Sequence, residues 1–565
     1  MKIILQLLVA FGFLVGISSC QQGNTESSSS LPQKEGLSWE DQKFSMFIHW
    51  GIYSIPAGIW NGEQISGYSE QIKGHAKIPT NKYRQLTKQF NPIHWNPDSV
   101  ALLAKAAGMK SVVITAKHHD GFCLFDSKYT DFDVVDATPY KNDIIKGLSD
   151  ACRKQGIDFG VYFSIIDWDF PGAMPFESTR NCDSIPPAHH QYNLNQVREL
   201  LTNYGEISEL WFDMGAPTPE QSKEIADLVK SLQPNCMVSS RLWNDQGDFI
   251  VMGDNKKAQL KMGVPWQSPA SMFHETWSYR SWQERPSVAS KIEEKVQDLV
   301  AVVSSGGNYL LNIGPRGDGS IVPFERDVLL GIGNWLEVNG EAIYATDAFP
   351  VESQEWGYVT SKPGKLFLNV LSSSAEDSIV VKNLEGKFSK AYSLVNSDNP
   401  LPIQKSNSGV SIAVNNAHLG IDPVSVIVLE YDQRETIYQP SSLVSLGKDG
   451  TYALNGDNAE KYFSTSGTSY ITRTNRVVKM KWYVPKSDMQ NMKVNINYQS
   501  LNAEPLVLLV NGKSHELDDQ QQSLNQQLTT IDLNQNQINE IELVQKNNCC
   551  PHKDLAIDAV SLVIH

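Results

Sequence analysis

Apolar runs alternate with amphipathic segments over roughly the first 345 residues of the chain. Buried parallel strands read as continuous runs rich in Val, Ile and Phe, and helices show apolar positions three to four residues apart. The runs that fit strands are FSMFIHWG (44–51), KSVVITAKHH (110–119), DFGVYFSII (158–166), ISELWFDM (207–214), CMVSSRLW (236–243) and NYLLNIGP (308–315). The segments that fit helices are PDSVALLAKAAG, NDIIKGLSDACRKQG, NLNQVRELLTNYG, PEQSKEIADLVKSLQ and KIEEKVQDLVAVVSSGG.

This alternation predicts an α/β fold over residues 37–346, a (β/α)8-like barrel of the TIM type. A doubly wound sheet is the alternative, but no Gly-rich phosphate-binding loop follows the first strand. From residue 347 the sequence changes to short runs in which apolar and polar residues alternate, with turn residues between the runs. Residues 347–432 therefore predict an antiparallel β-sandwich, and residues 433–565 a second one, carbohydrate-binding-like or a spacer.

The N-terminus has the features of a targeting segment. Lys2 precedes the apolar run IILQLLVAFGFLVGI, which is too short to span a bilayer comfortably. The run ends in ISSC, which resembles the lipobox of bacterial lipoproteins. We expect a signal peptide at residues 1–19, lipidation of Cys20, and a flexible Ser-rich tether over residues 20–36. The expected location is the bacterial cell envelope, on the periplasmic face or the cell surface, with the lipid as the only membrane contact.

The net charge and the spacing of the cysteines limit the classes of function that the protein can have. The formal net charge of −15 disfavours binding to nucleic acid, whose phosphates would be repelled. The six cysteines after Cys20 lack the CxxC spacing of a zinc site, so neither a metal cage nor a dense disulfide framework is indicated. We expect no cofactor.

Polar side chains recur at the ends of successive predicted strands, where a barrel of this kind places its chemistry. They include His49, His118, His119, Trp211, Asp213 and Arg241, and a further strand passes Tyr162 toward Asp167, Trp168 and Asp169. Neighbouring residues of a strand point to opposite faces, so His118 and His119 are poor joint metal ligands, and we expect no metal. Histidines, an arginine and aromatic faces suit a hydroxyl-rich ligand. Asp213 could then act as the nucleophile of glycoside hydrolysis, or simply cap the following helix.

The motifs FIHWGIYS, KHHDGF, VYFS, ELWFD and GGNYLLNIGPRGDGSIVP, in this order, resemble the α-L-fucosidases of glycoside hydrolase family 29. The resemblance covers about residues 37–345 and implies a barrel followed by a sandwich. It implies that Asp213 is the nucleophile of a retaining double displacement. It also implies that the sugar is bound by His49, Glu70, His118, His119, Tyr162, Trp211, Arg241 and Trp277.

The chain departs from the family pattern at the acid/base. Many members carry Trp-Glu ahead of a TWGY-like segment, and here that position is Gln267, in PWQSPASMFHETWSYR. An amide cannot deliver a proton to a glycosidic oxygen. Asp254, in MGDN, and Glu275, just before Thr276, are the two candidate replacements.

The sequence therefore predicts a retaining exo-α-L-fucosidase that removes terminal α-L-fucose, or the related α-L-galactose, from an oligo- or polysaccharide. The alternative is a surface glycan-binding lipoprotein that has kept the barrel and lost hydrolysis, a possibility that Gln267 supports. A metal-dependent hydrolase built on His118, His119 and Asp120 is a third.

Overall fold

The computed structural model describes residues 36–564 apart from short gaps, which are residues 182, 352–353, 372–376, 407, 415–422, 433–436, 439, 441, 488, 490–491, 498–505, 517–525, 536 and 546–560. The expected signal peptide, Cys20 and most of the tether lie outside the described residues. Within the described part, no helix is long and apolar enough to cross a bilayer.

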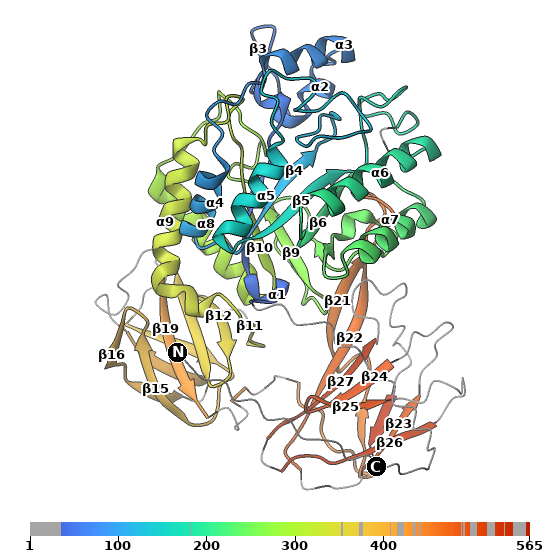
Figure 1. The fold of residues 1–565 in the computed structure, drawn as a ribbon. Helices are drawn as coiled ribbons and strands as arrows, with labels where there is room; N and C mark the ends of the chain where they lie inside the picture. Colours follow the sequence, from blue (N-terminus) through green and yellow to red (C-terminus); the bar gives the residue numbers. More distant parts are fainter. Residues whose placement is uncertain are drawn as a thin grey trace, which may run out of the picture. The chain divides into compact units, whose positions relative to one another are not determined.

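An eight-stranded parallel sheet forms the centre of the N-terminal part, and helices surround it (Figure 1). The strand order is β7-β6-β5-β4-β1-β10-β9-β8, and the sheet curls so that a parallel bridge between Ser239 and Phe249 joins its two edges. Its strands are β1 (Phe44–Ile48), β4 (Ser111–Lys117), β5 (Asp158–Ser164), β6 (Glu209–Asp213), β7 (Met237–Val238), β8 (Ile250–Val251), β9 (Trp266–Ala270) and β10 (Asn308–Ile313). All six predicted strands are present.

The apolar spacing predicted the larger helices of this part except the last, α9 (Pro323–Asn339), which follows strand β10. The larger helices are α4 (Pro97–Ala106), α5 (Ile144–Gln155), α6 (Pro187–Asn203), α7 (Pro219–Leu232), α8 (Val288–Ser304) and α9. Local signals fix their ends: α7 begins with a capping box between Thr218 and Gln221, and α5 ends at Gly156 in the left-handed conformation. The described residues between β7 and β9 contain no α-helix, so this side of the sheet departs from strict strand–helix alternation.

Shorter elements complete the N-terminal part. They are α1 (Trp39–Gln42), η1 (Ile52–Ser54), β2 (Ile59–Trp60), β3 (Glu63–Gln64), η2 (Ser69–Gln71), α2 (Ile72–His75), α3 (Thr80–Tyr83), η3 (Arg84–Gln89), η4 (Ser240–Leu242) and η5 (Gly340–Ala342). The strands β1, β4, β6, β9 and β10 are buried along their whole length. Burial of both sheet faces explains why their apolar runs are continuous rather than alternating.

Antiparallel sheets make up the C-terminal part. A six-stranded sheet, β11-β12-β13-β19-β15-β16, and a three-stranded sheet, β14-β18-β17, share one apolar core. These strands are β11 (Asp347–Ala348), β12 (Gly357–Lys362), β13 (Lys365–Leu371), β14 (Ser378–Lys382), β15 (Phe388–Ser393), β16 (Asn396–Pro400), β17 (Ile403–Ser406), β18 (Gly409–Ala413) and β19 (Val424–Tyr431).

A second pair of sheets follows, four-stranded β20-β28-β23-β26 and five-stranded β21-β22-β27-β24-β25, around a core of its own. Their strands are β20 (Tyr452–Leu454), β21 (Glu460–Ser466), β22 (Thr474–Val484), β23 (Met492–Asn497), β24 (Leu506–Val510), β25 (Lys513–Glu516), β26 (Gln526–Ile531), β27 (Asn539–Gln545) and β28 (Ser561–Ile564). Both pairs of sheets agree with the antiparallel strands that the alternating sequence pattern predicts.

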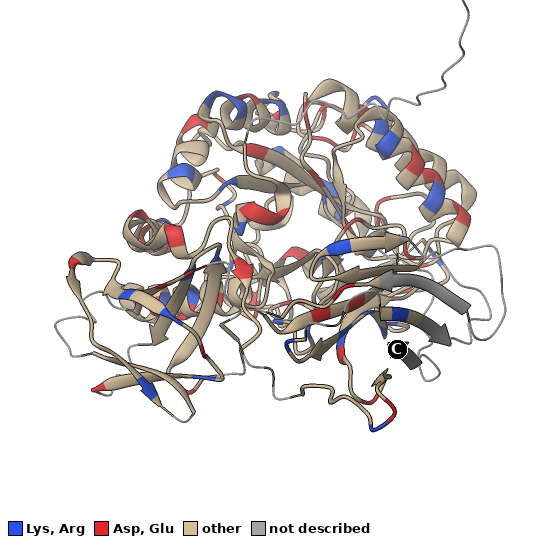
Figure 2. Ribbon diagram, turned by 90° about the horizontal axis from the view of Figure 1, so that it is seen from below, with Lys and Arg blue, Asp and Glu red and all other residues tan. Residues whose placement is uncertain are grey.

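Charged residues of both signs are interspersed along the helices around the parallel sheet (Figure 2). Three cysteines, Cys123, Cys152 and Cys236, are buried free thiols, and burial raises the pKa of each. They contribute to the core as small apolar side chains.

Candidate active site

Asp213, the last residue of β6, receives hydrogen bonds on both carboxylate oxygens. Tyr162 donates its hydroxyl to Oδ2 over 2.8 Å, while Arg241 Nη1 and the Tyr470 hydroxyl reach Oδ1 over 2.9 and 2.6 Å. Burial alone would raise the pKa of Asp213, but the Arg241 charge, His119 and the two phenol donors outweigh it and lower that pKa. Asp213 is therefore a buried carboxylate that stays ionised.

Arg241 joins two carboxylates through one guanidinium. Its Nη1 binds Asp213 and its Nη2 binds Asp254 Oδ1 over 2.5 Å, while the whole side chain is buried and lies over the Trp211 ring. The sequence placed Arg241 on a strand, and this was wrong. Strand β7 stops at Val238, and Arg241 lies on the single 3-10 turn η4. The turn directs the guanidinium back toward the end of β6.

His118 and His119 follow the end of β4 and lie with their ring centroids only 3.9 Å apart. The expectation that they point to opposite faces was wrong, because β4 stops at Lys117 and strand alternation no longer applies. His119 Nδ1 is 2.7 Å from the Ser164 hydroxyl, and its Nε2 lies 3.9 Å from Asp213 Oδ2. Burial lowers the pKa of His119 to about 4 and that of His118 well below its ordinary value, so both rings are neutral near pH 7.

Aromatic rings and His49 extend the cluster away from Asp213. Tyr162 stacks between Trp211 and His118, with centroid distances of 5.6 and 5.5 Å. His49 lies 5.3 Å from the Tyr162 ring and 5.2 Å from the Trp277 ring, and burial lowers the pKa of His49 to about 3. The structure thus brings His49, His118, His119, Tyr162, Trp211, Arg241 and Trp277 together around Asp213.

Glu70 holds the segment that carries Trp277. Its carboxylate accepts hydrogen bonds from the backbone N–H of Ser278 over 3.0 Å and of Trp277 over 3.4 Å, and from the Thr276 hydroxyl over 3.2 Å. The Glu70 side chain is buried, and burial raises its pKa. In this structure Glu70 positions Trp277.

The three residues linked to the acid/base question lie in different places. Gln267 is fully buried in β9, where Oε1 accepts from Trp211 Nε1 over 2.9 Å and Nε2 donates to Glu209 over 3.2 Å. Glu275 is exposed, and its carboxylate accepts from Gln283 over 3.3 Å. Asp254 contacts Arg241, which in turn contacts Asp213. Of the two candidate carboxylates, only Asp254 shares a partner with Asp213 among the described contacts.

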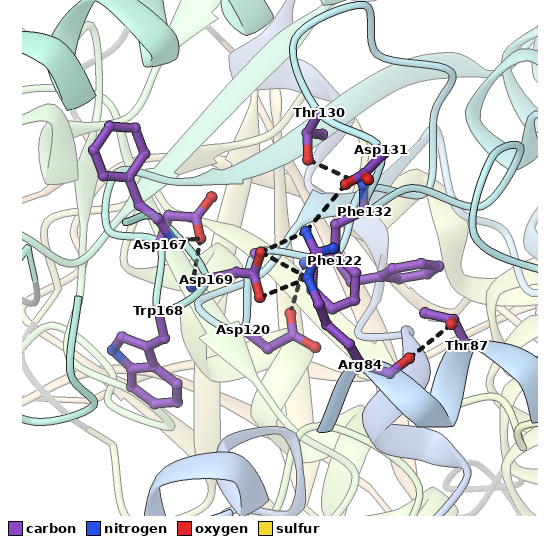
Figure 3. A network of polar contacts seen from close by, with 12 residues as sticks. Arg84, Thr87, Asp120, Phe122, Thr130, Asp131, Phe132, Asp167, Trp168 and Asp169 are labelled. Atoms are coloured by element: carbon purple, nitrogen blue, oxygen red, sulfur yellow. Dashed lines mark hydrogen bonds and ion pairs between the residues drawn. The ribbon is translucent and has the colours of Figure 1, made fainter. Parts of the chain in front are cut away.

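Asp120 lies outside this cluster, in the turn after the two histidines. It accepts hydrogen bonds from the Tyr83 hydroxyl and the Phe122 N–H, and burial raises its pKa to about 7. Figure 3 shows it beside Asp169, which Arg84 binds with three hydrogen bonds of 2.9–3.1 Å. These contacts fix the turn behind the site. Among the described residues, no group of three His, Cys, Asp or Glu side chains is arranged to hold a metal ion.

Three site residues were not singled out in the sequence. Ser164 orients His119, Asn312 Oδ1 lies 2.6 Å from His49 Nδ1, and Tyr470 binds Asp213. Ser164 and Asn312 are near the ends of β5 and β10, where strand-end position was an available signal. Tyr470 belongs to the C-terminal sheets, and no pattern in its neighbourhood pointed to the site.

The class of protein that this site fits is the glycoside hydrolases, which use an ionised carboxylate beside groups that bind sugar hydroxyls. The profile of the family described as Alpha-L-fucosidase matches residues 15–341. The match spans more than half of the chain, and the chain therefore belongs to the alpha-L-fucosidase family.

Individual relatives agree. Tissue alpha-L-fucosidase of Mus musculus is 31% identical over 350 residues, covering 59% of this chain and 76% of its own. A GH29 alpha-L-fucosidase of Bacteroides thetaiotaomicron, solved as a trapped covalent intermediate with 2-fluoro-fucosyl fluoride, is 29% identical with a TM-score of 0.63. That similarity covers 69% of this chain and 94% of the other. Alpha-L-fucosidase from Vibrio sp. strain EJY3 is 26% identical with a TM-score of 0.64, over 93% and 97% of the two chains.

Proposed function

We propose that this protein is a retaining exo-α-L-fucosidase that releases terminal α-L-fucose from glycans by double displacement. The observation that carries the proposal is the Arg241 guanidinium, which binds Asp213 on one side and Asp254 on the other. Retaining glycosidases place two carboxyl groups about 5–5.5 Å apart, and the shared guanidinium brings the carboxylates of Asp213 and Asp254 to one side chain. The covalent intermediate trapped in the Bacteroides relative supports the same reaction course.

In the first step, the Asp213 carboxylate attacks the anomeric carbon and the bond from that carbon to the glycosidic oxygen breaks. The departing oxygen takes a proton from Asp254, so a fucosyl ester on Asp213 and a free aglycone hydroxyl result. The charge of Arg241 keeps Asp213 ionised, which makes it a nucleophile at neutral pH. The neutral rings of His49, His118 and His119 can serve as hydrogen-bond partners for sugar hydroxyls.

In the second step, Asp254 takes a proton from a water molecule, whose oxygen attacks the anomeric carbon. The ester bond to Asp213 breaks, fucose leaves with retained configuration, and both carboxyl groups regain their starting state. Asp254 suits the acid/base role better than Glu275, because Glu275 is exposed and bonded to Gln283 instead of the Arg241 cluster.

The experiment is hydrolysis of aryl α-L-fucoside and aryl α-L-galactoside by the wild type and by Asp213→Ala. The wild type should release the fucoside, and Asp213→Ala should lose at least about three orders of magnitude in kcat/KM. The two sugars differ only in a hydroxyl on C6, so their kcat/KM ratio decides which is the natural glycone. Complete inactivity of the wild type on every α-L-glycoside would support the glycan-binding alternative instead.

The same proposal extends to the fold and the location. We take the curled sheet as a (β/α)8-like barrel, closed at the bridge between Ser239 and Phe249. The ISSC sequence supports a lipoprotein anchored at Cys20 in the cell envelope, where a surface fucosidase would meet extracellular glycans. Metabolic labelling with a clickable fatty acid, lost in Cys20→Ala, tests the anchor.

A further inference from the structure

The loop between β21 and β22 reaches the nucleophile, although it belongs to the last pair of antiparallel sheets. Tyr470 lies on this loop, 257 residues after Asp213 in the chain, and its hydroxyl donates to Asp213 Oδ1 over 2.6 Å. Its ring is 5.0 Å from the Trp243 ring in an edge-on arrangement, and the Arg241 guanidinium lies over it at 4.8 Å. The C-terminal sheets therefore supply one of the three hydrogen bonds that Asp213 receives from the described residues.

Several contacts attach this loop to the parallel-sheet part. Asn244 N–H donates to the Gly467 carbonyl over 2.9 Å, and Arg476 binds Asp245 over 3.2 Å. The residues before β9 pair with β21, where Gly263 N–H donates to the Phe463 carbonyl over 2.9 Å. These anchors all lie between β7 and β9, the stretch whose described residues contain no α-helix.

The loop itself is held in shape by local hydrogen bonds. The Thr472 hydroxyl accepts from the backbone N–H of Thr468 and Ser469, over 2.9 and 3.0 Å. The Tyr470 hydroxyl reaches Asp213 from this turn although the Tyr470 residue is 37% exposed, and its neighbour Ile471 is 92% exposed. Arg473 lies over the rings of Trp243 and Tyr470, at 5.2 and 5.4 Å. A preformed turn of this kind presents the Tyr470 hydroxyl in a fixed direction.

The hydrogen bonds to Asp213 distinguish its two oxygens. A carboxylate oxygen has two acceptor sites, and both sites of Oδ1 are used, by Arg241 and Tyr470. Oδ2 accepts from Tyr162 alone among the described residues within hydrogen-bond distance, and it faces His119. Tyr470 approaches from the side of Arg241 and Trp243, whereas His49, His118 and Trp277 lie on the Tyr162 side.

From this geometry we propose that Tyr470 is a positioning residue for the nucleophile, contributed by the C-terminal sheets. With Arg241 it holds Oδ1, so that Oδ2 is the oxygen that attacks the anomeric carbon. The inference rests on the proposed function, because it gives Tyr470 a role in the step that Asp213 performs. The hydrogen bond from Tyr470 also helps to lower the pKa of Asp213, which gives the role a measurable pH signature.

Tyr470→Phe removes the hydroxyl and keeps the ring between Trp243 and Arg241, and Ile471→Ala is the matched control on the same loop. Two quantities are measured for each variant. One is kcat/KM on an aryl α-L-fucoside across pH. The other is the rate at which 2-fluoro-fucosyl fluoride forms a covalent adduct, followed by intact-protein mass spectrometry.

Tyr470→Phe should lower both rates about 10- to 100-fold, because a hydrogen bond to a charged group is lost. It should also move the acidic limb of kcat/KM to higher pH, since the pKa of Asp213 rises when that donor is removed. Ile471→Ala should match the wild type in both measurements.

Unchanged rates and an unchanged acidic limb in Tyr470→Phe would overturn the inference. Faster hydrolysis by Tyr470→Phe or Tyr470→Ala would also overturn it, because Tyr470 would then be an obstruction at the nucleophile. In both cases a wild type that hydrolyses fucosides and an inactive Asp213→Ala would leave the proposed function intact. A wild type that neither hydrolyses fucosides nor forms the adduct would overturn the proposed function itself.

Discussion

The side-chain oxygen of Gln267 accepts a hydrogen bond of 2.9 Å from the indole nitrogen of Trp211, inside the parallel sheet. Gln267 also donates to Glu209, so both ends of its amide are engaged in a fully buried place. The amide at this position fixes Trp211, on which Arg241 and Tyr162 lie. A glutamine at position 267 therefore leaves Arg241 with both of its carboxylate partners, Asp213 and Asp254.

Gln267→Glu should therefore fail to raise activity and should lower stability. The new carboxyl group would lie beside Glu209, whose pKa burial already raises to about 7, and like charges at this distance cannot both ionise cheaply. We expect a loss of about 1–3 kcal/mol in the free energy of unfolding, larger at pH 8 than at pH 5. Thermal melts at the two pH values measure it. A variant with higher kcat/KM and unchanged stability would contradict this structural role.

Asp254→Asn and Glu275→Gln should separate the acid/base candidates. Asp254→Asn should lose about 10²- to 10⁴-fold in kcat/KM on substrates with poor leaving groups and less on activated aryl fucosides. Azide should restore turnover of the activated substrate, because a small anion can attack the fucosyl ester without a general base. Glu275→Gln is the matched control, since that carboxylate is exposed. The reverse pattern would transfer the role to Glu275.

Arg241→Lys should impair the enzyme although it keeps the positive charge. A lysine ammonium cannot reproduce the fork that binds Asp213 and Asp254 at once. The loss of one charge-assisted hydrogen bond corresponds to about 10- to 100-fold in kcat/KM. Because lysine keeps the positive charge that lowers the pKa of Asp213, the acidic limb of the pH profile should stay close to that of the wild type. Wild-type kinetics in this variant would show that charge alone suffices.

His189→Phe should make stability less sensitive to acid. His189 is fully buried, stacks on Phe170 at 4.6 Å, and burial lowers its pKa to about 4, whereas an unfolded histidine titrates near pH 6.5. Between these values the unfolded state binds the extra proton, so stability falls as pH drops from about 6.5 toward 4. Removing the group should stabilise the protein at pH 5 by about 2 kcal/mol relative to pH 7.5.

The test for His189 is the change in the free energy of unfolding at pH 5 minus the change at pH 7.5. Any misfit of the phenylalanine ring acts equally at both pH values and therefore cancels. Chemical unfolding at pH 5 and pH 7.5 measures both changes. His274→Gln, at an exposed histidine, should show no such difference. An equal stability change at both pH values in His189→Phe would contradict the buried neutral state.

Much of the parallel sheet was predictable, because buried strands leave continuous apolar runs that can be read directly from the sequence. Strand β9 was missed for a physical reason: its residues, Trp266–Ala270, include Gln267, Ser268 and Pro269, which do not read as a strand. Strand β8 has only two residues, Ile250 and Val251, and offers no period to detect. The boundaries of the domains and of the tether stay predictions.

The candidate site was predictable where its residues sit at strand ends. Asp213 and the histidines follow from that rule, and the structure brings them together with Tyr162 of strand β5. The choice between Asp254 and Glu275 required the three-dimensional structure, because both residues are loop carboxylates in the sequence. Tyr470 lay beyond sequence reasoning, since a contact across 257 residues leaves no local period or spacing.

The distance along the chain between Asp213 and Tyr470 has a consequence for biosynthesis. Translation proceeds at roughly 5–20 residues per second, so the ribosome needs on the order of 10 to 50 s to pass from Asp213 to Tyr470. Once Arg241 has been added, the nascent polypeptide contains Asp213 and the donors Tyr162 and Arg241, but it lacks Tyr470, the third donor to the carboxylate. A product that terminates before residue 470 therefore lacks one of the three hydrogen bonds that the Asp213 carboxylate receives from the described residues.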